Sequence, residues 1–146
     1  MSAWGRFHHS LRWRRHRHHI RVILIVGNVA VEIPADGVIH VATSLNVGQT
    51  VPLSISYLDQ NGQPMVPTPT PDSPAAWSQL DPTIQDLIAA QDGNTATATG
   101  LKAGSDTLQL TVIVGGQTFV ATMDAVVNAV VPAQTLTSVN IVATPA

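Results

Sequence analysis

The chain of 146 residues suits one domain of ordinary size with extensions, and it is too short for two full domains. Apolar residues make up 45% of it, which is enough for a buried core, whereas charged residues make up only 11%, roughly half of the usual share. This balance favours an extracellular or virion-type β-protein over a cytosolic enzyme. Cysteine is absent, which excludes disulfides, thiolate metal sites and cysteine nucleophiles.

The charges divide the chain into a basic arm and an acidic body. Five of the six histidines lie within residues 1–21, and all nine acidic residues come later, with Lys102 as their only basic companion. Residues 1–21 therefore carry a charge of about +6 and the rest about −8, which is typical of a tail with a partner of its own. The basic residues of the arm are Arg6, Arg12, Arg14, Arg15, Arg17 and Arg21.

Apolar side chains accompany the arginines of the arm. Trp4, Phe7 and Leu11 are spaced to share one helical face, but Gly5 weakens a helix, so a short helix and an extended peptide both stay open. We expect the arm to bind a groove on a neighbouring assembly protein; nucleic acid and an anionic membrane surface are the alternatives. The predicted partner-binding residues are Trp4, Phe7, Leu11, Arg12, Trp13, Arg14, Arg15 and Arg17.

Neither a membrane span nor a secretion signal is predicted. No stretch of about 18 apolar residues occurs in the sequence. Residues 22–31 have the apolar character of a secretion signal, but the basic region before them is too long, and Asn28-Val29-Ala30 is a poor cleavage site.

Hydrophobic patterns predict strands from residue 21 onward. The β-branched run Arg21–Val26 and the alternating Val29–Ile33 are expected to form a linking strand or hairpin of residues 22–37, outside the main domain. Val38–Leu45 follows as a strand, and Val51–Tyr57 has the clearest period of two in the chain. Its apolar side chains point one way, which predicts a sheet with one buried face.

Turn residues separate the strands that follow. Asn61-Gly62 favours a tight turn, and Pro64–Pro74 holds five prolines, which predict a stiff exposed loop because proline lacks a backbone N–H. Gly115-Gly116 is expected to close a hairpin, and residues 81–83 leave a helical turn open. The remaining predicted strands are Ala75–Leu80, Ile84–Ala90, Thr95–Thr99, Thr107–Val114, Gln117–Val127 and, within a C-terminal extension of residues 130–146, Thr135–Ala143.

Strands this short and this regularly spaced predict an all-β sandwich of two sheets. The body has few aromatic residues, and Trp77 is the largest of them. We expect Trp77 at the centre of the core, with a surface position as the alternative. Its expected neighbours between the sheets are Leu53, Ile55, Leu108, Leu110 and Val112.

Several stretches of the body resemble the bacterial Ig-like domains. They are the Trp-Ser strand within residues 76–84, the turn at Asp92-Gly93, the Gly-x-x-x-Gly turn within residues 98–104 and the Thr/Val alternation of residues 107–112. Residues 57–64 also look like the Asp-x-Asn-Gly-x-Pro corner of the related invasin-type domains. The resemblance covers residues 38–129, and it implies an immunoglobulin-like, two-sheet antiparallel sandwich with an N-terminal arm and an extra C-terminal strand.

Domains of this family occur in bacterial adhesins and as decorations on tailed-phage capsids, tails and fibres. Adhesins string many copies together behind a secretion signal, whereas this sequence has one copy and an Arg/His arm. We therefore expect a non-enzymatic structural protein of a tailed-phage virion, a capsid decoration, cement or tail-associated protein attached through the arm within a homo- or hetero-oligomeric assembly. The alternative is a module of the bacterial cell surface or extracellular space that binds carbohydrate or host protein.

The chemically active side chains of the sequence favour binding over catalysis. His40 is the only body histidine, and a lone histidine near hydroxyls on a strand is ordinarily a surface residue. The aspartates lie in turns, where they normally cap their own backbone, although loop aspartates bind calcium in some β-sandwiches. We predict no catalytic residue, no metal site and no cofactor. The arm histidines lack acidic partners and lie among arginines, whose charge opposes a cation; they are His8, His9, His16, His18 and His19.

Overall fold

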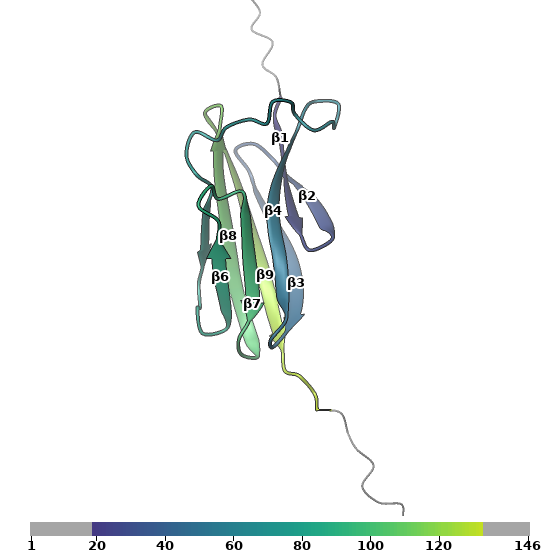
Figure 1. Cartoon of the computed structure of the whole chain (residues 1–146), viewed down its shortest axis with the longest axis vertical. Helices are drawn as coiled ribbons and strands as arrows, with labels where there is room; N and C mark the ends of the chain where they lie inside the picture. The colour runs from purple at the N-terminus through teal and green to yellow at the C-terminus, as the bar shows by residue number, and fades with distance from the viewer. Residues whose placement is uncertain (1–18, 133–146) are drawn as a thin grey trace, which may run out of the picture.

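The computed structural model describes residues 19–132. Within this range the chain forms nine strands and no helix, and the strands make two sheets, so the predicted all-β two-sheet architecture is confirmed. Figure 1 shows the strands running along the long axis of the molecule. The strands are β1 (Arg21–Val26), β2 (Val29–Ile33), β3 (Val38–Asn46), β4 (Thr50–Leu58), β5 (Ala76–Gln79), β6 (Gln85–Ala89), β7 (Thr95–Gly100), β8 (Gly104–Val114) and β9 (Gln117–Asn128).

The two sheets have five and four strands, in the orders β2-β1-β4-β7-β6 and β3-β9-β8-β5. Every pairing is antiparallel except that of β3 with β9, which is parallel, so the fully antiparallel expectation is wrong for this pair. The reason lies in the segment after β2, which crosses to the other sheet: Ala35 bridges to Phe119, and the N–H of Asp36 donates to the carbonyl of Thr118 at 2.9 Å. This crossing starts β3 beside the start of β9, and both strands then run the same way.

Strands β1 and β2 correct the predicted boundary at residue 38. β1 pairs with β4 along its whole length and with β2 on its other side, so residues 22–37 belong to the sandwich and are not a linker outside it. Val22 and Leu24 are fully buried in the core, and the outward-facing Ile23 is only 9% exposed. Because side chains on both faces of β1 are largely buried, the run is continuously apolar instead of alternating.

The core is built from alternate residues of the strands, as the period of two predicts. Phe119 is its largest fully buried side chain. Trp77 is only partly buried and packs against the margin of the core, so its predicted central position is wrong. Its indole N–H donates to the carbonyl of Gly93 at 2.6 Å, which holds the ring beside the β6–β7 turn. Of its expected neighbours Ile55 is partly buried, and the buried ones are Leu53, Leu108, Leu110 and Val112.

One buried carboxylate fixes the connection between β5 and β6. Asp106 is 5% exposed, and its Oδ1 accepts the backbone N–H of Asp81 at 2.8 Å and that of Thr107 at 2.7 Å. Its Oδ2 accepts the side-chain amide of Gln85 at 3.3 Å. A buried carboxylate is tolerated when it accepts several hydrogen bonds, and here they anchor the loop to β8.

The described chain enters and leaves the sandwich at opposite ends (Figure 1). His19 and Ile20 precede β1 at one end, and Val130 and Val131 follow β9 at the other, where they are 61% and 80% exposed. The predicted arm up to residue 18 and the predicted strand at residues 135–143 lie outside the described residues.

Candidate functional site

The eight predicted partner-binding residues all lie in residues 1–18, outside the described part of the chain: Trp4, Phe7, Leu11, Arg12, Trp13, Arg14, Arg15 and Arg17. The structure does describe the surface from which the arm departs. Arg21, predicted as the last residue of the arm, is the first residue of β1, so the arm ends at Ile20. His19 and Ile20, the last two residues of the arm, each line a hollow of the surface. The candidate site is therefore built around this point.

Three hollows adjoin one another along Pro64–Pro74, and together we call them the proline groove. The largest has a volume of about 700 Å³ and is lined by Ile20 and by most of the proline segment. A second, of about 210 Å³, shares Asp59 and Met65 with it and adds His19. A third, of about 380 Å³, shares Thr68, Pro69 and Thr70 with the largest and continues to Asp92 and Asn94.

The proline segment is pinned to the sandwich at both ends, so the groove is preformed. At its start the N–H of Met65 donates to the carbonyl of Tyr57 at 3.1 Å. Near its end the N–H of Asp72 donates to the carbonyl of Ile113, and Asp72 Oδ2 accepts the N–H of Gly116, both at 2.8 Å. Proline rings between these anchors restrict the backbone further, so a ligand would meet a surface that needs little ordering.

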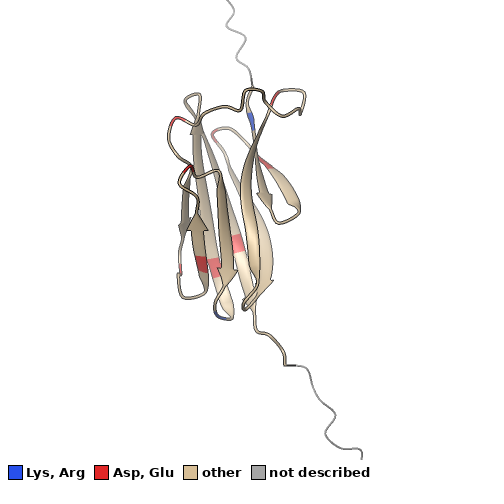
Figure 2. Cartoon of the chain, viewed as in Figure 1, with Lys and Arg blue, Asp and Glu red and all other residues tan. Residues whose placement is uncertain are grey.

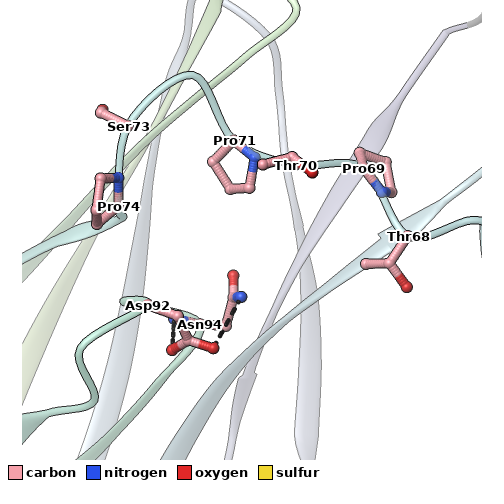
Figure 3. A pocket seen from close by; sticks show the side chains of 8 residues that line it. All are labelled: Thr68, Pro69, Thr70, Pro71, Ser73, Pro74, Asp92 and Asn94. Carbon is pink, nitrogen blue, oxygen red and sulfur yellow. Dashed lines mark hydrogen bonds between the residues drawn. The ribbon is translucent and has the colours of Figure 1, made fainter.

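Polar groups form the wall opposite the prolines in the third hollow. Figure 3 shows Asp92 and Asn94 lying across the hollow from Pro71 and Pro74. Asp92 caps its own turn, because its Oδ1 accepts the N–H of Asn94 at 3.0 Å and its Oδ2 accepts the Asn94 amide at 3.2 Å. Asn94 Oδ1 in turn accepts the hydroxyl of Tyr57 at 3.3 Å. These bonds hold a carboxylate and an amide at the rim of a hollow that is otherwise lined by proline, threonine and serine.

Most of the charged residues that the structure describes around the groove are acidic (Figure 2). Asp59 and Asp92 line it, and Asp72 follows Pro71. Of the two described residues with a fixed positive charge, Lys102 lies in the turn between β7 and β8, which is at the other end of the sandwich (Figure 1). Arg21 pairs with Glu32, to which its Nε donates at 2.9 Å. Arg21 also lies beside the Asp59 turn, and the pKa of Arg21 is raised by its hydrogen bond to Glu32 and also by the charge of Asp59, so Asp59 is partly compensated. Asp72 and Asp92 are the carboxylates at this end that would attract a cationic partner.

Asp59, Asp81 and Asp92 cap their own turns, as predicted, whereas Asp106 lies in β8 and not in a turn. Asp59 accepts hydrogen bonds from the N–H groups of Asn61 at 2.8 Å and Gln63 at 2.9 Å. These bonds lower the pKa of Asp59, and the bond from Gln63 has the largest effect. Asp81 accepts the hydroxyl of Thr83 at 2.7 Å and its N–H at 2.9 Å, which lower the pKa of Asp81. Both carboxylates are thus held ionised by local donors.

The turn at Asp59 predicts a pH-dependent contribution to stability. Because the folded state lowers the pKa of Asp59, its stabilisation is complete above the unfolded pKa and is lost as the pH falls through the folded pKa. Asp59→Asn should therefore lower the midpoint of thermal unfolding at pH 7, and its difference from the parent chain should shrink toward pH 2. A difference that stays constant over this range would contradict the role of the charged cap.

The other candidate groups stay apart from one another. His40 is exposed on the outer face of β3, where its register partner on β9 is Thr122. Within residues 19–132 no three His, Cys, Asp or Glu side chains gather in a way that could hold a metal ion. No helix in this range is long and apolar enough to cross a membrane.

Sequence reasoning identified the proline segment as a stiff exposed loop and missed the groove. The far wall comes from the β6–β7 turn, about twenty residues further along the chain, and no local pattern indicates that Asp92 faces Pro71. The sequence feature that could have indicated the far wall is the pair of polar residues Asp92 and Asn94 on either side of Gly93, which by itself predicts only a turn.

Comparisons with known proteins give no family for this chain. No protein-family model matches it, and no curated protein matches it. Two similar solved structures are the crystal structure of the S-layer protein SbsC domains 4 and 5 and that of the S-layer protein rSbsC(31-844), each with 17% identity and a TM-score of 0.40. The matches cover 67% and 72% of this chain but only 58% and 16% of those chains. Similarity of this degree carries no conclusion about family or function.

Proposed function

We propose that this chain is a non-enzymatic, Ig-like interaction module that serves as a structural accessory protein of a tailed-phage particle and is attached through its N-terminal arm. The observation that carries the proposal is the separation of charge. The part of the chain from β1 to Pro132 holds all nine acidic residues and two arginine or lysine residues, whereas residues 1–18 hold five arginines and three large aromatic residues. A segment of that composition is suited to binding a partner by apolar anchors and charge.

The Ig-like part of the proposal is supported by strand order. Ig domains of the constant type place strands A, B, E and D in one sheet and C, F and G in the other. The order β1-β4-β7-β6 corresponds to A-B-E-D, and β5, β8 and β9 correspond to C, F and G. Strands β2 and β3 are then additions between A and B, one at the outer edge of each sheet.

A bacterial surface module remains the second candidate. Its support is the groove itself, whose apolar floor with a carboxylate and an amide at the rim suits a carbohydrate or peptide of a host. The two candidates differ in where the chain is found. Purified particles should contain it as a stoichiometric component under the phage proposal, whereas washed cells should carry it under the alternative.

Deletion of residues 2–18 tests the role of the arm. Every described strand and all core residues stay in place, so we expect the midpoint of thermal unfolding to change by less than about 4 °C, the effect of about 1 kcal/mol in a small domain. Incorporation into particles, measured by quantitative electrophoresis of purified particles, should fall to background. Full incorporation of the truncated chain would disprove attachment through the arm.

Paired substitutions separate the apolar from the charged part of the arm. Trp4→Ala with Trp13→Ala removes two anchors, and Arg14→Gln with Arg15→Gln removes two charges as the matched control. Exposed charge pairs contribute about 0–1 kcal/mol each, whereas buried aromatic anchors contribute about 2 kcal/mol or more. The aromatic pair should therefore reduce incorporation more than the arginine pair.

A further inference from the structure

We propose that the proline groove is the receptor for the arm of a second copy of this chain, so that two copies exchange arms and form a closed dimer. The inference deepens the proposed function, since it rests on the arm being an assembly device and names the surface that receives it. Three properties of the groove carry it: its chemistry, its charge and its position at the root of the arm.

The chemistry of the groove suits aromatic anchors. Proline rings and the 92% exposed Val66 form an apolar surface, and the partly buried Met65 lines it while also packing against the core. Aromatic side chains pack well against proline-rich segments, a pairing that several peptide-recognition domains use. The arm supplies three aromatic residues, Trp4, Phe7 and Trp13, and each buries roughly 150–250 Å² when covered.

The charges of the groove and the arm are complementary. Asp59 lies at one end of the groove and Asp92 at the other, with Asp72 close to Pro71. No lysine or arginine of residues 19–132 lines any of the three hollows. The arm carries five arginines in residues 1–18, and arginine forms the strongest pairs with carboxylates. Such complementarity favours this partner over an acidic or neutral peptide and makes the encounter fast.

The position of the groove determines how copies assemble. His19 and Ile20 line the groove, so each arm departs from the same end of the sandwich that receives an arm. Two copies that face each other with this end can fill both grooves reciprocally about a two-fold axis, and the assembly closes. A receptor at the end after β9 would instead generate an open chain of copies. The arm of the same chain is the alternative occupant, and the experiments below distinguish it from the arm of a second copy.

Sedimentation equilibrium of the purified full-length chain tests the proposal. We expect a monomer–dimer equilibrium that weakens as the salt concentration rises from about 50 to 500 mM, because exposed charges are screened. Val66→Lys places a cation in the groove and should raise the dimer dissociation constant at least about 30-fold, as the loss of a central contact does. Leu80→Lys adds the same charge outside the groove, at a residue that is 80% exposed, and should leave the constant unchanged.

A mixing experiment separates exchange between copies from other arrangements. The chain lacking residues 2–18 keeps its groove and has no arm, and the Val66→Lys chain keeps its arm and has a blocked groove. Each alone should be monomeric, whereas their mixture should form a 1:1 heterodimer through one arm in one groove. Because it retains one of the two contacts, its dissociation constant should be higher than that of the full-length dimer. A full-length chain that stays monomeric at all concentrations, or a dimer that survives deletion of the arm, would overturn the proposal. A third outcome would also overturn the proposal. If the full-length chain is a monomer and Val66→Lys makes trypsin cleave its arm arginines faster, the arm occupies the groove of its own chain.

The outcomes also distinguish this proposal from the proposed function. A dimer with these properties in a chain that is absent from particles would leave the exchange of arms intact and disprove the phage role. A chain that is stoichiometric in particles but monomeric when purified would keep the phage role, and its arm would then bind a different subunit.

Discussion

Phe119→Ala should destabilise the sandwich by about 3–5 kcal/mol, more than the corresponding change at Trp77. Phe119 is 1% exposed and is the largest fully buried side chain, so its removal loses transfer free energy and leaves a cavity that the surrounding strands cannot fill. It pairs in register with the fully buried Val112 on β8 and also bridges to Ala35, where the chain crosses between the sheets. The substitution therefore weakens the core at the place where both sheets are joined.

Trp77→Ala is the informative comparison. If the size of the ring alone determined the loss of stability, removing tryptophan would cost more than removing phenylalanine. Its indole is only partly buried, and its removal costs the packing against the core margin and one hydrogen bond to Gly93. We expect about 1–3 kcal/mol. Val38→Ala, at a residue that is 55% exposed, is the control and should change stability by less than about 0.5 kcal/mol. Urea unfolding gives the free energy of unfolding of the three variants, which can be compared if their m-values are equal. A larger loss for Trp77→Ala than for Phe119→Ala would contradict this description of the core.

The strands that sequence reasoning placed best are those with one buried face. Leu53 and Tyr57 alternate with more exposed neighbours along β4, and this alternation was sufficient to predict the strand and its inward face. The turns at Gly62 and at Gly115-Gly116 were predictable for a local reason, since these glycines have φ between 59° and 78°. Local conformation and one-sided burial are properties that a short stretch of sequence can encode.

The features that were missed depend on contacts between distant segments. The parallel pairing of β3 with β9 joins residues about eighty positions apart, with no hairpin to impose its direction. Trp77 was assigned to the centre by its size, but its N–H requires an acceptor, and the carbonyl of Gly93 provides one only at the margin of the core. The proline groove was missed for the same reason, since Asp92 reaches it from another turn.

Gly93→Ala should be among the most damaging single-methyl changes in the chain, costing about 3–5 kcal/mol. A Cβ at residue 93 would lie 2.3 Å from the carbonyl oxygen of Ala75 and 2.5 Å from its nitrogen, and these are backbone atoms of a buried residue that cannot move aside cheaply. The φ of Gly93 is +71°, a left-handed conformation that costs an alanine about 1–2 kcal/mol by itself. Any shift that relieved the contact would also move the carbonyl that accepts the Trp77 indole.

Gly48→Ala is the matched control for this change. Gly48 has a φ of +82°, but a Cβ there would meet no atom within 4 Å, so the control carries the conformational cost without the collision. We expect about 1–2 kcal/mol for Gly48→Ala, and the difference between the two variants measures the close approach of the β6–β7 turn to the segment before β5. Urea unfolding followed by circular dichroism gives both values. Equal losses would mean that Gly93 is required only for its φ angle, and that the turn which carries Asp92 to the groove is not held against Ala75.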